Sequence, residues 1–527
     1  MIDTEILQKA IKLTQTGHFK EAKGIYEDLL EKEPDDVNLL SLYGLFNVNI
    51  GNFEKAVEIL SHATEIKETL GTVSALGLAA FEMGDYQKSA EVLEHSLQFG
   101  QSPDILNKLI LSLFEIKNYE KAIEYSDKMY ADYPEDFRAI ANKVKSLTKS
   151  GKLLEAENLC VTVLKQNPDV SSLWFHLGFL KELIYCDDKQ AKECYKVAAE
   201  LGNPDADYNI AVSCAKLQEF DEAEKYYKKM LEKRPNDEDT ITSLGMCYLA
   251  QRRFKEGYDL FFRRNKSSLD KKTNNPWKPD DEIAQEVVII CDQGFGDQIQ
   301  FARYLPFLED RKINVAVLPN LKGLLANNYP NCNFISYDEI DPKMQSIRIT
   351  DLAYVLGMDF EHIPYSEGYL KSETADIKSD KLKIGLCWEA GAAGIRTMIN
   401  RTIHVKCFEP MLNLENIQVY SFQLNDTLGG NEKYPQMINL AKDFKSFSDT
   451  AKALMAMDVM VTVDTSVAHL AGALGVKTFL MLPYATDWRW FSDTKTTDWY
   501  KSVEIFKQTD SISWEEPLNR IIERLKN

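Results

Sequence analysis

A short pattern of residues recurs along the first half of this chain at nearly constant spacing, and it constrains the fold more than any other feature. Each copy starts with Gly or a polar residue, has an aromatic residue or Leu two positions later, and has a small residue five positions later. The copies begin at Gly17, Gly51, Gly84, Lys117 and Gly151, with weaker copies at Cys186, Gln218 and Arg252. The successive spacings are 34, 33, 33, 34, 35, 32 and 34 residues. Such a fixed period indicates a repeat array.

This period is that of the tetratricopeptide repeat (TPR), in which each unit is a helical hairpin. The small residue lets the two helices of a hairpin approach closely, and the aromatic residue fills the gap between neighbouring repeats. A proline ends the second helix of four units, at Pro34, Pro134, Pro168 and Pro235. One unit, AKECYKVAAELGNPDADY from Ala191 to Tyr208, resembles the Sel1-like variant. We therefore predict a right-handed α-solenoid of TPR or Sel1-like hairpins over residues 1–265.

A solenoid of this kind usually offers a concave groove to a peptide or protein. We predict that the groove binds a protein partner. Asparagine side chains are candidates to grip a peptide backbone there, at Asn38, Asn47, Asn107 and Asn142. The alternative is a scaffold that only supports the following domain or a homodimer.

Composition excludes several classes of protein. The chain has 527 residues and a net charge of −19, and its Lys and Arg residues form no run longer than two, so we expect no nucleic acid partner. None of the nine cysteines forms a CxxC pair, which argues against a zinc site and favours free thiols in a reducing compartment. The sequence shows neither a signal peptide nor an 18-residue apolar stretch. We expect a cytoplasmic protein without a membrane span.

The period of the apolar residues changes after a polar segment, which we predict to be a linker over residues 266–282. Buried strands then alternate with helices, a pattern typical of parallel α/β sheets. We predict two Rossmann-like halves, at 283–372 and 373–527. The strands are expected at 286–291, 314–318, 333–336, 383–388, 417–422, 458–463 and 476–482, with helices at 298–308 and 467–474.

Glycine-containing turns follow two of these strands, at 292–297 and 389–394. Neither a dinucleotide fingerprint GxGxxG nor a P-loop GxxxxGK[ST] is present, so NAD chemistry and ATP hydrolysis are not supported. Ligands of open α/β sheets bind at the carboxyl ends of the strands. We therefore expect a cleft between the two halves.

Four segments, in order, resemble one family. CDQGFGDQIQFARYLPFL (291–308) is similar to EQGLGDTIQFARYLPLL, and VDTSVAHLAGALGVKTFLMLPYATDWRW (463–490) is similar to VDTAVAHLAGALGKPVWVLLPYAPDWRW. The segments 383–412 and 497–508 match as well. These are motifs of bacterial tetratricopeptide proteins with a heptosyltransferase-like (family 9-like) glycosyltransferase domain. The resemblance covers residues 280–525, and it is specific for fold and family but not for sugar or acceptor.

The resemblance implies the GT-B fold and an inverting glycosyltransferase that uses a nucleotide-sugar as co-substrate, without a cofactor or a bound metal. Asp297 matches the family's catalytic aspartate, which would take the proton of the acceptor hydroxyl. The alternative role for Asp297 is a helix N-cap. His469 matches the family's HLA motif and is the second predicted catalytic residue.

The nucleotide-sugar would be held at the glycine turn and at the start of the helix near Val467, where backbone N–H groups and the helix dipole favour a phosphate. Asp464 is expected to organise that turn, and Arg401, with Arg396, to pair with the phosphates. Trp388, Tyr484, Trp488 and Trp490 are expected to contact base or sugar, or to pack the two halves. The predicted donor site comprises Gly294, Gly296, Trp388, Arg401, Asp464, Thr465, Ser466, Tyr484, Asp487 and Trp488.

The chain departs from the family pattern at Asp292, where Glu is usual, at Glu389-Ala390, which replaces Ser-Gly, and in the apolar loop 391–400. The leading hypothesis is transfer of a sugar to a Ser or Thr of a protein presented by the repeats, for example flagellin or another surface protein. One alternative is a glycan or lipid-linked acceptor. Another is a non-catalytic TPR scaffold with a degenerate GT-B domain.

Overall fold

A computed structural model describes residues 4–264, 272–279, 281–359, 363–391, 401–491, 495–509 and 513–526. The chain divides into two compact units. The first comprises Met1–Leu180 with Val197–Asn203, and the second comprises Lys181–Lys196 with Pro204–Asn527. The division therefore falls inside the helical repeats, and the last repeats belong to the same unit as the α/β region.

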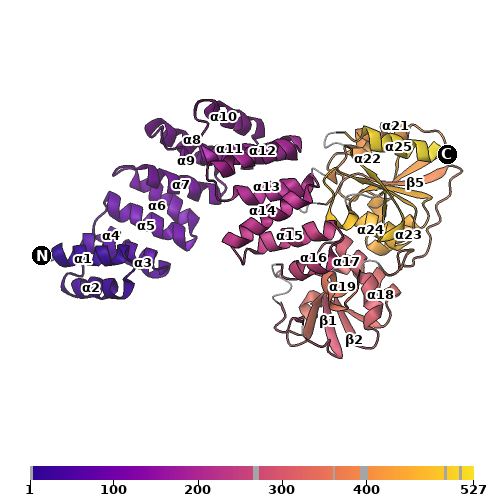
Figure 1. Ribbon diagram of the computed structural model, residues 1–527, viewed down its shortest axis with the longest axis horizontal. Coiled ribbons are helices and arrows are strands. Elements are labelled where there is room, and N and C mark those ends of the chain that lie inside the picture. The colour runs from indigo at the N-terminus through magenta and orange to yellow at the C-terminus, as the bar shows by residue number, and fades with distance from the viewer. Residues whose placement is uncertain are drawn as a thin grey trace. The chain divides into compact units, whose positions relative to one another are not determined.

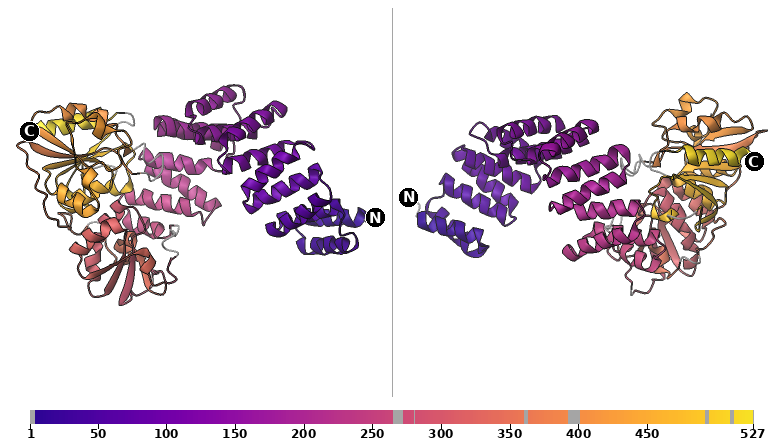
Figure 2. Two further views of the ribbon diagram at one scale, coloured as in Figure 1. Left: turned by 180° about the vertical axis from the view of Figure 1, so that it is seen from behind. Right: turned by 45° about the horizontal axis from the view of Figure 1, so that its top comes forward.

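The N-terminal part of the chain is a series of antiparallel helix pairs, which Figures 1 and 2 show stacked on one another within each unit. The helices are α1 (Thr4–Gln15), α2 (Phe19–Lys32), α3 (Val37–Asn49), α4 (Phe53–Ile66), α5 (Leu70–Met83), α6 (Tyr86–Ser96), α7 (Pro103–Glu115), α8 (Tyr119–Asp132), α9 (Arg138–Lys149), α10 (Leu153–Gln166), α11 (Ser171–Tyr185), α12 (Asp188–Glu200), α13 (Ala206–Lys216), α14 (Phe220–Lys233), α15 (Glu238–Ala250) and α16 (Phe254–Phe261).

The residue that starts each repeat pattern has a left-handed backbone in the turn between two helices. At four of the turns it is a glycine, with φ between 77° and 85°. At the other four it is Lys117, Cys186, Gln218 or Arg252, with φ between 51° and 63°. The conformation costs a glycine little, and it costs a residue with a Cβ more. The turn geometry therefore explains why the pattern begins with Gly or a polar residue.

The other pattern positions have the expected packing roles. The small residues of six repeats are fully buried, at Ala22, Ala56, Ala122, Ala156, Ala191 and Ala223. Helices α2, α8, α10 and α14 each end two residues before the proline of their repeat. Glycine also permits close helix contact within a pair, because a Cβ on Gly44 would lie 2.4 Å from Cγ of Leu60. The predicted solenoid of helical hairpins is confirmed.

The α/β region contains two sheets. Strands β1 (Glu286–Ile290), β2 (Lys312–Ala316), β3 (Cys332–Ile335) and β4 (Gln345–Arg348) form a parallel sheet in the order β3-β2-β1-β4. The second sheet has the order β10-β11-β9-β8-β5-β6-β7 and is parallel except for the β10–β11 pair. Its strands are β5 (Leu382–Cys387), β6 (Ile417–Ser421), β7 (Ile438–Asn439), β8 (Val459–Val463), β9 (Thr478–Leu482), β10 (Thr496–Thr497) and β11 (Tyr500–Lys507).

Short helices pack around these sheets. They are α17 (Phe295–Phe301), α18 (Pro319–Asn328), α19 (Leu352–Val355), α21 (Glu409–Leu412), α22 (Gly430–Lys433), α23 (Phe447–Leu454), α24 (Ser466–Ala473) and α25 (Glu515–Lys526), with 3-10 turns η2 (Ala302–Leu308), η3 (Tyr337–Glu339), η4 (Ile349–Asp351), η5 (Val405–Phe408), η6 (Ala441–Asp443) and η7 (Trp488–Trp490). Helix α17, which follows β1, packs against α24, which follows β8; both helices are labelled in Figure 1.

The seven predicted strands correspond to observed ones, but β4, β11 and the two-residue strands β7 and β10 were not predicted. Strand β4 has only four residues, three of them polar, so its sequence carries little apolar pattern. Strand β11 alternates polar and apolar residues at one side of the sheet. The helix predicted at 298–308 begins three residues earlier and continues as the 3-10 turn η2, which contains Pro306.

The described part of the predicted linker packs against the first sheet. Ser346 of β4 accepts a hydrogen bond from the backbone N–H of Trp277 and donates one to the carbonyl of Asn275, both at 2.9 Å. The Trp277 ring is buried against Phe262. The buried ring of Trp277 helps to hold this polar segment against the sheet. Because most of the other residues are polar, composition alone predicted a linker.

The last repeats share a hydrophobic core with the α/β region. Leu249, Tyr258 and Phe261 belong to the same cluster of buried side chains as β1 and α24. The ring of Trp488 lies 6.0 Å from that of Phe261 and 6.4 Å from that of Tyr258. A solenoid followed by an α/β region is thus confirmed, whereas the GT-B assignment and the boundaries at 265, 283 and 373 stay predictions.

Among the described residues, none of the helices is both long enough and apolar enough to cross a lipid bilayer.

A candidate active site between the two sheets

A cavity of about 810 Å³ lies where the ends of the two sheets and the last repeats meet. Its lining comes from the glycine turn after β1, from the turns after β5, β6 and β8, and from α15 and α16. Most residues predicted for the site line it: Gly294, Gly296, Asp297, Arg401, Asp464, Thr465, Ser466, His469, Asp487 and Trp488. Residues separated by almost 200 positions in the sequence therefore share one cavity.

The glycine turn brings Asp297 to the cavity at the start of α17. Gly294, and not Asp297, is the N-cap residue of this helix, and no side chain caps it. The capping alternative for Asp297 is therefore wrong. Gly296 faces the second half of the region, and a Cβ there would lie 2.7 Å from Cδ2 of His469. Glycine at this position serves the close approach of α17 to α24.

Five charged side chains alternate in sign across the cavity. Arg401 contacts Asp464 at 3.1 Å and Asp487 at 3.6 Å. Arg489 contacts Asp487 at 2.8 Å and also forms an ion pair with Asp297. Each arginine is therefore shared between two carboxylates, and the five side chains together carry one negative charge when all are ionised.

Burial and the arginines together set the ionisation of these carboxyl groups. Burial raises the pKa of Asp297 above its usual range, although Arg489 acts in the opposite direction. Burial likewise raises the pKa of Asp464, against the effect of Arg401. Burial also opposes ionisation of Asp487, but Arg489 and Arg401 outweigh it and lower the pKa of Asp487 to about 2. Asp487 is the carboxylate bound to both arginines, and it is the firmly ionised member of the group.

His469 is a neutral imidazole at the wall of the cavity. Its Nδ1 lies 3.0 Å from the hydroxyl of Tyr500, and its ring stacks on Trp490 at 4.8 Å between centroids. Burial, followed by the charge of Arg489, lowers the pKa of His469 to about 3. At neutral pH His469 can exchange a hydrogen bond with a ligand, but it brings no positive charge to a phosphate.

The start of α24 contributes a polar edge to the cavity. Thr465 is its N-cap residue, and its hydroxyl accepts a hydrogen bond from the backbone N–H of Val467 at 3.3 Å. Ser466 is the first helical residue and is half-buried in the lining. The unpaired N–H groups of a helix start favour an anion.

Two of the predicted donor residues do not line the cavity. Trp388 is fully buried in the core of the second half, where its indole N–H donates to Glu389 at 3.1 Å. Tyr484 is half-buried, and its backbone N–H donates to Gln508. Trp490 lies behind His469, as its stacking contact shows. Arg396 and most of the loop 391–400 fall outside the described residues.

Glu389, noted as a departure from the family pattern, holds a loop at the cavity. Its carboxylate accepts hydrogen bonds from the backbone N–H groups of Thr427 and Leu428, both at 3.1 Å. Gln423 accepts from the N–H groups of Trp388 and Glu389 on the other side of this loop. The substitution at 389 therefore has a structural role, which sequence comparison with a family motif does not reveal.

Arg264, at the end of the repeats, also lines the cavity and was not predicted. Its guanidinium donates to Asp351 at 2.6 Å, to Asp292 at 3.0 Å and to Thr350 at 2.5 Å. The guanidinium of Arg264 and the carboxylates of Asp292 and Asp351 are almost fully buried. Asp292 opens the glycine turn, so Arg264 joins the last repeat to the segment that holds Asp297. Arg489 was considered only as part of the DWRW segment, for which a structural or donor-site role was expected, and it was not among the individually predicted site residues.

Most of the asparagines predicted for the solenoid groove form hydrogen bonds within the repeats. Asn142 donates to Asn107 at 2.8 Å, and Asn47 donates to the carbonyl of Tyr43 at 2.7 Å while it accepts from Asn52. Asn47 and Asn142 are buried, and only Asn38 is exposed. Three of the four asparagines therefore already have hydrogen-bond partners within the repeats, and their contact with a peptide stays a prediction.

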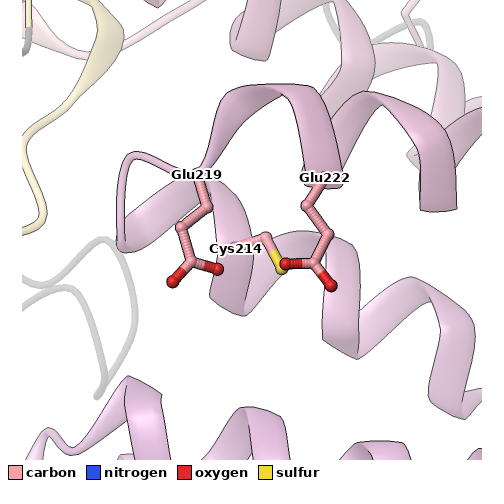
Figure 3. A group of neighbouring side chains, drawn as sticks. All are labelled: Cys214, Glu219 and Glu222. Carbon is pink, nitrogen blue, oxygen red and sulfur yellow. The ribbon is translucent and has the colours of Figure 1, made fainter.

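Cys214, Glu219 and Glu222, drawn in Figure 3, form a group with the geometry of metal ligands. Lysines of α12 already neutralise both carboxylates, since Lys192 lies 2.5 Å from Glu219 and Lys196 lies 3.4 Å from Glu222. Burial, and then the charge of Glu222, raises the pKa of the Cys214 thiol to about 12. A protonated thiol beside two ion-paired carboxylates gives no reason to assign a metal here.

The tetratricopeptide repeat family matches residues 74–137 and 189–238. Protein FlbA of Caulobacter vibrioides is 22% identical over 466 residues, a match that covers 77% of this chain and 76% of FlbA. Since the repeats end near the middle of the chain, this match extends into the α/β region. The chain thus contains tetratricopeptide repeats and is similar to FlbA over most of its length.

Solved repeat structures resemble parts of the chain. A tetratricopeptide repeat protein from Parabacteroides merdae has a TM-score of 0.40 at 16% identity, covering 46% of this chain and 97% of its own. Yeast Tom70 has a TM-score of 0.39 at 19% identity, covering 46% of this chain and 54% of its own.

Proposed function

We propose that this protein is an inverting glycosyltransferase that moves a sugar from a nucleotide-sugar to a hydroxyl of a protein held by its repeats. In this reaction the acceptor oxygen forms a bond to the anomeric carbon, and the bond from that carbon to the phosphate oxygen breaks. The electron pair of the broken bond goes to the phosphate, and the proton of the acceptor goes to the carboxylate of Asp297.

The observation that carries the proposal is the composition of the cavity wall. Asp297, from the turn after β1, faces Arg401, Arg489 and the start of α24, which come from the second half. A general base on one side, with guanidinium groups and backbone N–H groups on the other, meets the needs of sugar transfer from a phosphate leaving group. The four segments that resemble the glycosyltransferase family supply most of these residues.

A protein acceptor is favoured by the repeats themselves. Thr242 and Met246 of α15, and Phe261 of α16, line the cavity together with the candidate base. A polypeptide bound along the last repeats would thus reach the reacting atoms without a separate acceptor domain. Flagellin or another surface protein is the kind of acceptor that we propose.

Thermal unfolding in the presence of nucleotides tests the proposal. UDP, GDP, ADP and CMP are each added to the full chain, and a ligand at 100 times its Kd stabilises the folded protein by about 2.7 kcal/mol. We expect one of them to raise the unfolding temperature, and Ser466→Ala and Arg401→Gln to reduce the shift. The exposed Arg524, which pairs with Glu504 on the far side of β11, provides the control Arg524→Gln.

Turnover is tested separately with the matching nucleotide-sugar and candidate acceptor proteins. The Asp297→Asn variant is expected to bind nucleotide but not to transfer sugar. If no nucleotide changes the unfolding temperature of the wild-type protein, with or without Mg²⁺, the proposal is overturned and a non-catalytic repeat scaffold becomes the better account.

A further inference from the structure

The ion pairs of the cavity pose a problem for any ligand that carries a phosphate. Among the residues that the structure describes, Arg401 and Arg489 are the two arginines of the second half that line the cavity, and both already contact carboxylates. Three carboxylates stand against these two guanidinium groups. A phosphate entering this arrangement would meet a net negative group at short range, where repulsion amounts to several kcal/mol at an effective dielectric constant of about 20.

Arg489 is the arginine best placed to change partner. Its side chain is 13% exposed, and it bridges Asp487, which lies two residues before it, and Asp297, which lies on the opposite half. Its Nε is buried and has no hydrogen-bond partner among the described residues. A guanidinium has five N–H donors. Arg489 can therefore keep its bond to Asp487 and turn its remaining donors from Asp297 to a new acceptor.

The ion pair with Arg489 weakens Asp297 as a base. An acceptor hydroxyl gives up its proton more readily to a carboxylate whose charge is not already neutralised by a guanidinium. The contact with Arg489 thus makes Asp297 a weaker base than the same side chain without it. The ion pair between Arg489 and Asp297 must therefore break before Asp297 can act as an effective base.

We propose that Arg489 is the phosphate-binding residue that switches the base on: without a donor it holds Asp297 in an ion pair, and the donor phosphate draws it away and frees Asp297. This inference rests on the proposed function. It assigns Arg489 a contact with the leaving group and predicts that the nucleotide-sugar binds before the acceptor hydroxyl can be deprotonated. It requires no movement of the backbone.

The switch also links nucleotide binding to protons. Asp297 faces Arg489 and Asp487 of the η7 turn, Asp292 of its own turn, and the neutral His469 of α24. Burial already raises the pKa of Asp297, and Arg489 is the chief group that lowers it. Moving Arg489 to a phosphate therefore raises that pKa further. At a pH low enough to protonate the freed Asp297, nucleotide binding should take up protons and tighten as the pH falls. Turnover should fall over the same range, because only the ionised carboxylate can accept the proton of the acceptor hydroxyl.

Titration calorimetry on the full chain tests the inference, with UDP, GDP, ADP, CMP and inorganic pyrophosphate as probes. In the wild-type protein at mildly acid pH we expect Asp297 to take up protons when the probe binds, seen as a dependence of the heat on the ionisation enthalpy of the buffer. Asp297→Asn should tighten binding about tenfold, because it removes the competing charge. Arg489→Gln should weaken binding by about 10–100-fold, as loss of a charge-assisted hydrogen bond does.

The double variant separates the switch from two independent effects. In the Arg489→Gln background, Asp297→Asn should no longer tighten binding by the same factor, since the pair is already broken. Arg524→Gln makes the same change of charge outside the cavity and should leave the affinity unchanged.

The possible results distinguish the inference from the proposed function. If a probe binds but Asp297→Asn binds it no more tightly, and no proton is taken up by the wild-type protein, the switch is overturned and the proposed function stands. If none of the five probes binds, the proposed function itself is overturned, and the inference with it. The proton uptake should be lost in both Asp297→Asn and Arg489→Gln, so either variant that folds distinguishes protonation of Asp297 from protonation of the phosphate of the probe.

Discussion

Gly296 lies so close to the imidazole of His469 that a Cβ at position 296 would sit 2.7 Å from Cδ2 of the ring. The two residues come from the two halves of the α/β region, and their contact is part of the packing of α17 against α24. The space available at this one position therefore affects how the two halves close on the cavity.

Gly296→Ala is expected to destabilise the protein by about 1–3 kcal/mol, since the neighbouring atom is a packed ring and overpacking costs this much. The matched control is Gly294→Ala in the same turn. A Cβ there would lie 3.6 Å from Asp297, an ordinary contact, and the backbone is extended with φ −61°. Urea unfolding of both variants checks the prediction, and equal stabilities would contradict it.

His469 should make the stability depend on pH in acid. Its pKa is lowered to about 3 in the folded protein, chiefly by burial, whereas an unfolded histidine titrates near its ordinary value. Between these values the unfolded chain binds more protons than the folded one, so this contribution is complete above about pH 6.5 and is lost as the pH falls toward 3. The expected slope is about 1.4 kcal/mol per pH unit.

Tryptophan fluorescence is a suitable measurement for this slope. Trp174 is the one tryptophan of the seven that precedes residue 181, so the signal reports mainly on the unit that contains His469. Unfolding of the wild-type protein is compared with that of His469→Gln between pH 4.5 and 7.5. The variant should show a shallower dependence on pH, and parallel curves would argue against a buried, neutral His469.

Arg264→Met should be strongly destabilising, by about 3–5 kcal/mol, because it leaves Asp292 and Asp351 buried without their common partner. Arg263 is exposed and adjacent, and Arg263→Met provides the control. Adding Asp292→Asn to Arg264→Met should recover part of the loss, since Asp351 keeps its ion pair with Arg348 and no other carboxylate of this network is then without a partner. Chemical denaturation measures all three proteins, and a mild effect of Arg264→Met would contradict the role given to this network.

A fragment of residues 181–527 should fold on its own, whereas residues 283–527 should not. The longer fragment retains Leu249, Tyr258 and Phe261, which share a core with β1 and α24, and it retains Arg264. The shorter one exposes that core and removes the ion-pair partner of Asp292, whereas Asp351 keeps only Arg348. Cooperative thermal unfolding of each purified fragment checks this, and a stable 283–527 fragment would show that the last repeats are dispensable for folding.

The sequence predicted those features that depend on local conformation or on a period. The start of each repeat pattern is a residue with positive φ, from Gly17 to Arg252, and the helices of four repeats end two residues before a proline. A turn geometry and a missing backbone N–H act on the residues that carry them, so they leave a mark in the sequence at regular intervals. Apolar runs such as 286–290 predicted the buried strands for the same reason.

The motifs also predicted which residues gather at the cavity, with the exceptions of Trp388 and Tyr484. Both aromatic residues follow strands, and nothing in a linear motif distinguishes a ring that faces a cavity from one that fills a core. Trp388 is enclosed by its own half, against Gly430 and Val405. Sequence position thus located the neighbourhood but not the direction of the side chain.

What the sequence determined by itself was the repeat solenoid, the positions of seven of the eleven described strands and the turns that carry the candidate residues. Only the tertiary structure decided the partners of the charges: Arg489 with Asp297, Arg401 with Asp464, and Arg264 with Asp292 and Asp351. These partners stand between 28 and 192 positions apart in the sequence. Such pairs follow no sequence period and no local conformational preference. They form only when folding buries opposite charges together, where water can no longer solvate either one.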